Sequence, residues 1–275
     1  ELIAAAQKLG LESKVVDAKK GGLSKKCLSG LPEGSGPLLR AAGIEDPSAI
    51  DDDGVGIFWR TDHLQAERLE VMMYPSSGSG ALKVSFRDLR HSRDFSVVGT
   101  HLGSGDSRDD EDQRLREQVD PPGGLSDWVA ASRKKGDASV LCLDANAFPQ
   151  IDTPEGSSSV WRSLRNALGA SVWDEYFDED GQPRPTNGKA AVDSPVTVNK
   201  VRGPASGQAK KIGLHAYYCI DHIFYSMEHF SLQRHAFPVR RFPSPTTALE
   251  AVIPSLAMPS DHYPIVVDIR WGPSL

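Results

Sequence analysis

The sequence lacks any long apolar run, any paired-cysteine motif and any excess of positive charge. A helix that crosses a bilayer needs about 20 consecutive apolar residues, so we expect no membrane span. The chain has three cysteines, Cys27, Cys142 and Cys219, without CxxC spacing. We expect free thiols, which favours an intracellular, cytoplasmic location but leaves the compartment open.

The formal net charge of −6 argues against electrostatic binding of nucleic acid by the surface as a whole. A local basic patch beside a cleft would suffice for an enzyme, so acidity does not exclude a nucleic-acid substrate. A chain of 275 residues, 39% of them hydrophobic, can bury a sizeable core. It starts at Glu1 without Met or an apolar leader. We expect one monomeric domain over residues 1–275 that is truncated at its N-terminus.

The alternation of apolar segments with turn residues and amphipathic stretches predicts a layered α/β protein. Residues 1–10 predict a short helix, and the polar residues 174–213 predict a loop. Strands are expected at 55–59, 69–74, 82–86, 95–100, 140–143, 220–225 and 265–271, the first four as an antiparallel meander. Helices are expected at 110–119, 125–135 and 160–168, and Trp128 and Trp161 are expected to pack in the core.

Polar residues occur where several of these strands begin or end. His101 closes a strand in Thr-His-Leu, Asp144 and Asn146 follow an apolar strand, Asp221 opens one in Ile-Asp-His-Ile, and His262 belongs to Ser-Asp-His. Taken singly, each has a simpler structural reading: a satisfied histidine, an Asx turn, or a turn before a strand. Function gathers at strand ends, however, and four such elements in one chain favour a shared catalytic cleft.

The order of these motifs resembles the endonuclease/exonuclease/phosphatase superfamily from about residue 53 to residue 271. The resemblance begins with the strand Asp53-Gly54-Val55-Gly56-Ile57-Phe58-Trp59-Arg60 and includes residues 111–118. Each motif is weak alone, whereas their fixed order is specific. The motif sequences are most similar to those of nocturnin-like deadenylases and related exonucleases. It implies a DNase I-like fold: a four-layer α/β sandwich with two packed, mostly antiparallel sheets flanked by helices.

The resemblance also implies a role for each matching side chain. His101 would contact the scissile phosphate. Asp144 would activate or orient the attacking water, and Asn146 would hold that water or a phosphate oxygen. Asp221 would fix the tautomer of His262, whose ring would face the phosphate. Charge neutralisation and a positioned nucleophile are what phosphodiester hydrolysis requires.

The cofactor implied by the resemblance is Mg²⁺, with Mn²⁺ as an alternative, bound by Asp144 and Asp261. The family's principal metal ligand is a glutamate on an earlier strand, and we expect it upstream of Glu1, because residues 1–10 match the helix that follows it. Without that carboxylate the chain is expected to be a poor catalyst. Leu143 replaces the family's glycine before Asp-x-Asn, which should change strand packing more than chemistry.

A basic cluster of Lys200, Arg202, Lys210 and Lys211 lies between two of the motifs. It is either a solvated surface or a loop that grips phosphate. The leading hypothesis is a Mg²⁺-dependent nuclease that degrades RNA from its 3′ end. One alternative is a phosphatase or lipid phosphodiesterase acting on an inositol phosphate, sphingomyelin or another small phosphoester. The other is a non-catalytic binding module that lacks the metal glutamate.

Overall fold

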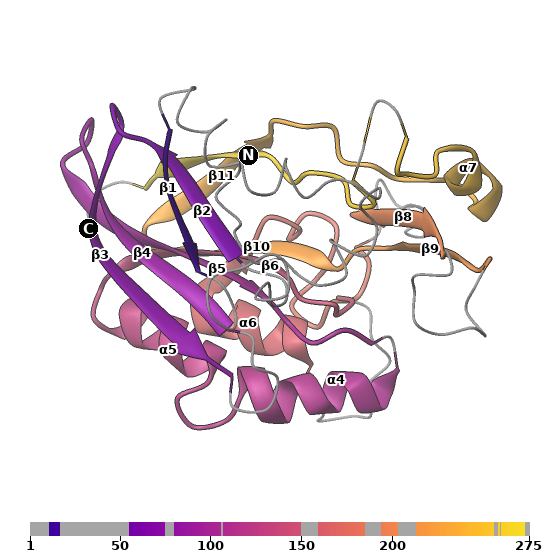
Figure 1. Cartoon of the computed structure of the whole chain (residues 1–275), viewed down its shortest axis with the longest axis horizontal. Coiled ribbons are helices and arrows are strands. Elements are labelled where there is room, and N and C mark those ends of the chain that lie inside the picture. Colours follow the sequence, from indigo (N-terminus) through magenta and orange to yellow (C-terminus); the bar gives the residue numbers. More distant parts are fainter. Residues whose placement is uncertain are drawn as a thin grey trace, which may run out of the picture. The chain divides into compact units, whose positions relative to one another are not determined.

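The computed structural model describes residues 11–16, 55–74, 80–105, 107–149, 159–184, 194–202, 213–255, 258 and 260–272 (Figure 1). It divides into two compact units, Glu1–His101 and Leu102–Leu275, and each is presented by itself. The helix expected at 1–10 and the thiol of Cys27 lie outside the described residues. The expectation of one monomeric domain stays a prediction.

The first unit consists of strands. β1 pairs antiparallel with β2, and a meander joins β3, β4 and β5 in antiparallel order. The bounds are β1 Leu11–Val16, β2 Val55–Arg60, β3 Leu64–Met73, β4 Gly80–Asp88 and β5 Arg93–His101. The four strands predicted from residue 55 onwards are confirmed, although β3 begins before the predicted range and ends one residue short of it. The prediction that all four form one meander is wrong, because β2 pairs with β1 and only β3, β4 and β5 follow one another in the meander.

The core of the first unit lies between β2 and the meander. Alternate residues of β2, among them Ile57 and Trp59, pack against Leu82, Val84 and Phe86 of β4. The rings of Trp59 and Phe86 meet edge to face with centroids 5.1 Å apart. Because strand side chains alternate between faces, one apolar face of each strand is enough to close this core.

The second unit mixes helices and strands. Its helices are α4 Arg108–Arg114, the π-helix η2 Leu115–Val119, α5 Leu125–Lys134, α6 Val160–Leu168 and α7 Pro245–Glu250. Its strands are β6 Ala138–Asp144, β7 Gly169–Ser171, β8 Val198–Val201, β9 His215–Tyr218, β10 Asp221–Ser226, β11 Phe230–His235 and β12 Val267–Trp271. β10 pairs antiparallel with both β6 and β7, while β8 pairs with β9 and β11 with β12.

Helix α6 covers one face of the β6–β10–β7 sheet (Figure 1). Ser159 caps its first turn by accepting a hydrogen bond from the Arg162 amide, and Gly169 ends it in the left-handed conformation. Trp161 is 1% exposed and packs on Phe224 of β10 with ring centroids 5.2 Å apart. The apolar face of α6 therefore buries one face of the sheet in the core, and the opposite face can carry polar functional side chains.

Several predicted elements match and several were missed. The helix over 160–168 is confirmed at both ends, and the helical prediction over 110–119 corresponds to α4 and η2. The loop expected over 174–213 is wrong in part, because it contains β8. β1, β7, β9, β11 and α7 were not predicted. Trp161 is buried as expected, whereas Trp128 is only partly buried.

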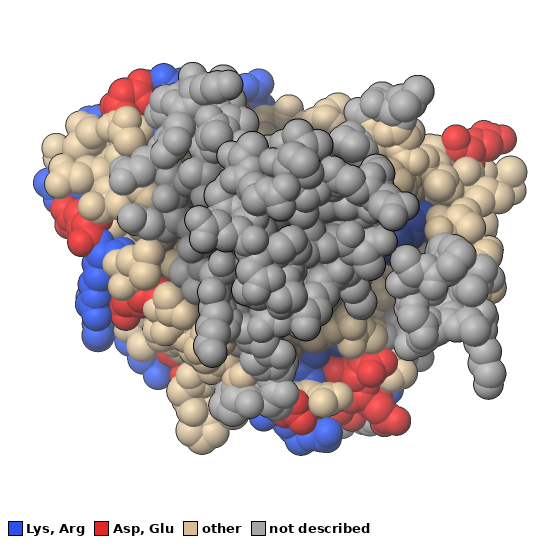
Figure 2. Space-filling view, viewed as in Figure 1, with Lys and Arg blue, Asp and Glu red and all other residues tan. Residues whose placement is uncertain are grey.

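Among the described residues, every helix is too short or too polar to span a bilayer. On the face shown in Figure 2, acidic and basic side chains of the described residues are interspersed along the visible surface. This distribution agrees with the modest net charge of the chain.

Candidate active site

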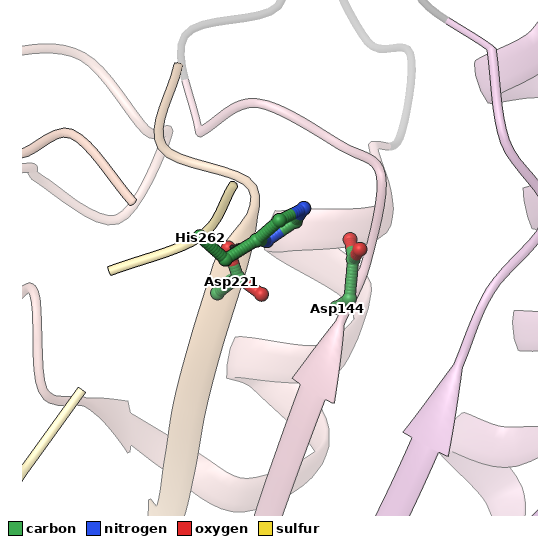
Figure 3. Close-up of side chains that lie close together, drawn as sticks. All are labelled: Asp144, Asp221 and His262. Atoms are coloured by element: carbon green, nitrogen blue, oxygen red, sulfur yellow. Dashed lines mark hydrogen bonds and ion pairs between the residues drawn. The ribbon is translucent and has the colours of Figure 1, made fainter. Parts of the chain in front are cut away.

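Three of the predicted side chains meet at one edge of the β6–β10 pair. Asp144 is the last residue of β6 and Asp221 the first of β10, and the antiparallel register places them directly opposite each other. Side chains of opposite residues share a face of the sheet. Ligand atoms of Asp144, Asp221 and His262 all lie within 4.8 Å of one another (Figure 3). The site occupies the face of the sheet that is turned away from Trp161.

His262 is oriented by Asp221, because the Nδ1 atom of the imidazole lies 2.9 Å from the Asp221 carboxylate. Burial would lower the pKa of His262, but the hydrogen bond and charge of Asp221, with the nearby charges of Asp144 and Asp261, raise it above the ordinary 6.5. This pair leaves Nε2 as the ring atom that can meet a substrate. Figure 3 shows the imidazole pointing towards Asp144.

Asn146 lies in a tight turn just after β6. Its φ of +46° is left-handed, and its backbone amide donates to the Asp144 carboxylate at 2.8 Å, so an Asx turn is present here. The side-chain amide donates to the carbonyl of Leu102 at 3.0 Å. Two-residue strand periodicity therefore does not set the direction of the Asn146 side chain. Turn geometry places Asn146 beside Asp144.

Asp261, which we expected among the metal ligands, forms an ion pair with Lys200 of β8. Burial would raise the pKa of Asp261, but the hydrogen bond and charge of Lys200 lower it below its usual range. The carboxylate is not part of the group formed by Asp144, Asp221 and His262. The role of Asp261 as a metal ligand stays a prediction, because in this structure its carboxylate is paired with Lys200.

The other predicted residues are not all placed at this site. His101 is the exposed last residue of β5 and belongs to the first unit, so its part in catalysis stays a prediction. Arg202 follows β8 directly, and its backbone amide donates to the Leu214 carbonyl. Lys210 and Lys211 lie outside the described residues, and a phosphate-binding role for the cluster is untested.

Thr197 is a buried residue that sequence reasoning missed. Its hydroxyl accepts hydrogen bonds from the backbone amides of Ile220 and Asp221, both at 3.0 Å. Its carbonyl accepts from the amide of Tyr263 at 2.7 Å. Thr197 thus ties the start of β10 to the segment that carries His262. The alternation in Val196-Thr197-Val198 is a strand signal that could have drawn attention to it.

A buried ion pair supports the segment around Leu102, whose carbonyl accepts the hydrogen bond from the Asn146 side chain. Glu111 and Arg114 have side chains 0% and 3% exposed, and their charged groups lie 3.0 Å apart. Arg114 also donates to the carbonyls of Gly103 and Gly105, and Glu111 accepts from the backbone amide of Val160. The pair therefore joins helices α4 and α6 to the segment that follows Leu102.

The donor set fits a hard divalent cation. Mg²⁺ and Mn²⁺ prefer carboxylate oxygens and are often held by one or two carboxylates, with water completing the shell. Asp144 and Asp221 supply such oxygens on one face of the sheet, and His262 adds a nitrogen that Asp221 holds in place. These three residues could therefore bind a divalent metal ion.

The fold is that of the endonuclease/exonuclease/phosphatase proteins, which confirms the expected DNase I-like α/β class. The sequence itself matches no protein-family model and no curated protein. The likeness is instead one of structure. At this level of sequence identity it establishes the fold and leaves the activity open.

Solved structures of this fold cover nearly the whole chain. The catalytic domain of human nocturnin with bound sulfate is 14% identical, covers 98% of this chain and 76% of its own, and gives a TM-score of 0.58. ANGEL2, a 2′,3′-cyclic phosphatase in complex with adenosine-2′,3′-vanadate, is 15% identical over 98% and 78% of the two chains, with a TM-score of 0.55. An endonuclease/exonuclease/phosphatase family protein from Bacteroides thetaiotaomicron is 13% identical over 95% and 75%, with a TM-score of 0.50.

Proposed function

We propose that this chain carries the catalytic site of a divalent-metal-dependent phosphodiesterase that degrades RNA from its 3′ end. The observation that supports it best is the convergence of Asp144, Asp221 and His262 within 4.8 Å at one strand edge. The likeness in fold to nocturnin and ANGEL2 agrees with a phosphoester substrate.

The geometry supports a role for each of these side chains. Asp144 orients a water molecule for attack on phosphorus and accepts its proton. Asn146, fixed beside it by the turn, holds that water or a phosphate oxygen. Asp221 holds Nδ1 of His262, so that Nε2 can donate to a phosphate oxygen as negative charge grows there. A bound Mg²⁺ would neutralise charge on the phosphate and lower the pKa of water.

Two further parts of the proposal concern residues that are not placed at the site. His101 would donate to the scissile phosphate. Asp261 would join the metal ligands by exchanging Lys200 for the cation, which frees the Lys200 ammonium for a phosphate oxygen. After this exchange Asp261 would be paired with the metal ion and the phosphate oxygen with Lys200, so each anion would keep a cationic partner.

The test is hydrolysis of labelled RNA by the protein together with any residues that precede Glu1 in the intact chain. Single-stranded oligo(A) with Mg²⁺ should release nucleotides progressively from the 3′ end, and a chelator should stop the reaction. Asp144→Ala is the matched inactive control. Binding of the oligonucleotide without any cleavage would overturn the proposal and favour a non-catalytic binding module.

A second candidate is a phosphatase acting on a small or terminal phosphoester. It agrees with the likeness in fold to ANGEL2, a 2′,3′-cyclic phosphatase. An RNA ending in a 2′,3′-cyclic phosphate and a set of small phosphate monoesters should therefore be assayed in parallel. Opening of the cyclic phosphate or release of inorganic phosphate, with the internal linkages intact, would select this candidate.

A further inference from the structure

Strand β3 forms the outer edge of the meander in the first unit and carries a stripe of exposed apolar side chains (Figure 1). Leu69, Val71 and Met73 are 43%, 43% and 47% exposed. Their spacing of two residues places all three on one face of the strand. Single exposed apolar residues are ordinary on a protein surface, whereas a contiguous apolar patch marks an interaction site.

This stripe continues the apolar core of the unit past its border. In the antiparallel register Leu69 lies opposite Val84 of β4, and Val71 lies opposite Leu82. Opposite residues share a face of the sheet. Both β4 residues are buried in the core that β2 covers, whereas their β3 neighbours are left partly open. A further strand beside β3 would extend the same apolar face.

The backbone edge of β3 can accept such a strand. Among the described strands, β4 is the one that pairs with β3. Alternate residues of an edge strand direct their N–H and C=O groups away from the sheet, which makes the edge a template for pairing. The register with β4 is regular from Arg68 to Met73 and shifts at a bulge between Ala66 and Arg68. A new ladder could therefore extend over residues 69–73.

The features that usually protect a strand edge lie in the first half of β3. The bulge is flanked by the exposed charges of Glu67 and Arg68, and bulges and charges both discourage pairing. The second half, residues 69–73, contains one charged residue, Glu70. Its carboxylate lies 3.1 Å from the ammonium of Lys83. Because this ammonium neutralises Glu70, the second half of the edge is left without effective charge protection.

Residues 69–73 are complementary to their own sequence in the antiparallel direction. When two such strands are related by a two-fold axis at Val71, each Val71 lies opposite its own copy and each Leu69 lies opposite Met73 of the other strand. Every pair on the exposed face is then apolar. On the other face Glu70 lies opposite Met72, so no like charges are brought together.

We propose that β3 pairs antiparallel with β3 of a second copy of this chain over residues 69–73, which forms a two-fold symmetric dimer. Such a contact closes on itself, because each copy uses its own β3 edge. A ladder of this length is a small interface, so the dimer should dissociate on dilution. The inference does not depend on the proposed function, and it departs from the monomer that the sequence led us to expect.

Sedimentation equilibrium of the intact protein over a series of concentrations tests the association. The mass should rise reversibly from that of one chain towards that of two. Val71→Lys brings like charges together on the axis and should raise the dissociation constant about tenfold or more. Leu89→Lys is the matched control, because Leu89 is 45% exposed and lies outside β3; it should change the constant by no more than about twofold. Urea unfolding at low concentration should show that both variants fold like wild type.

Cysteine crosslinking in a Cys27→Ser background tests the register. Val71→Cys should form a disulfide-linked dimer, because opposite Cα atoms of an antiparallel pair are about 4.5–5.5 Å apart, which suits a disulfide. Leu69→Cys is the matched control: its exposure equals that of Val71, but the two copies of residue 69 would lie about 14 Å apart along the strands. Adding Met73→Cys to Leu69→Cys should restore crosslinking.

The outcomes that contradict the dimer are distinct. A single-chain mass at every concentration would overturn it, and protection of the outward-facing β3 amides from hydrogen exchange in that monomer would assign the edge to another segment of the chain. Association that survives Val71→Lys, or that Leu89→Lys weakens equally, would overturn the assignment to β3. Crosslinking of Leu69→Cys as efficient as that of Val71→Cys would overturn the register.

Discussion

Acidification should destabilise the protein through His222, a histidine enclosed in the core beneath the candidate site. Its ring is 1% exposed, lies against Trp161 with centroids 5.1 Å apart, and has Nε2 2.9 Å from the carbonyl of Ala147. Nδ1 is buried without a hydrogen-bond partner. Burial lowers the pKa of His222 from 6.5 to about 4, although the Ala147 carbonyl and Asp221 oppose the shift.

The sign and size of the effect follow from linkage. Between about pH 6.5 and the folded pKa of about 4 the unfolded chain binds a proton at this position and the folded chain does not, so the free energy of unfolding falls as pH falls through this range. The loss approaches roughly 3 kcal/mol at pH values below the folded pKa, and between about pH 7 and about pH 5 it amounts to roughly 2 kcal/mol. Above about pH 7 the residue contributes no pH dependence.

Urea unfolding at those two pH values, in wild type and in His222→Gln, measures this contribution. The glutamine carries a donor towards Ala147 and does not titrate, so the variant should lose roughly 2 kcal/mol less than wild type on acidification. His222→Phe, which replaces the ring with an apolar one, should show the same reduced slope from a different starting stability. Identical pH dependence in wild type and both variants would refute a neutral buried His222.

Three further outcomes are expected. Asp144→Ala and His262→Ala should each lower kcat by several orders of magnitude with little change in thermal unfolding; near-normal turnover in either would remove that residue from the mechanism. Thr197→Val keeps the shape of the side chain but deprives two backbone amides of their acceptor, so it should cost about 1–3 kcal/mol in urea unfolding and also lower kcat. Glu111→Ala leaves Arg114 buried without its anion and should cost about 3–5 kcal/mol; a cost near zero would show that water reaches the pair.

The strand ends of the candidate site could be predicted because they depend on local sequence. Asp144 and Asp221 each interrupt an apolar run at a point where a buried carboxylate would be costly. A polar residue in that position indicates that the strand ends there and that its side chain has an interaction partner. The helix over 160–168 could also be predicted, since its apolar spacing, its serine cap and its terminal glycine all lie within a few residues.

Features that depend on distant partners could not be predicted. β8 is only 4 residues long and pairs with β9, whose first residue lies 14 positions beyond the end of β8. No local pattern shows that pairing. The ion pair of Asp261 depends on Lys200, 61 residues earlier. The direction of the Asn146 side chain could not be predicted for a different reason, because its left-handed turn breaks the alternation that a continuing strand would have kept.

Because Asp144 and Asp221 face each other across one antiparallel ladder, the pleat of the sheet sets the spacing between the two acids. The long connection from residue 145 to residue 220 does not set it. Changes of length within that connection can therefore alter the surroundings of the candidate site while the acids keep their separation. A slip of β10 by one residue would instead turn its acid towards Trp161 and bring His222 to the reacting side. The connection can therefore vary in length without moving the two carboxylates, whereas the register of β10 cannot change without losing the site.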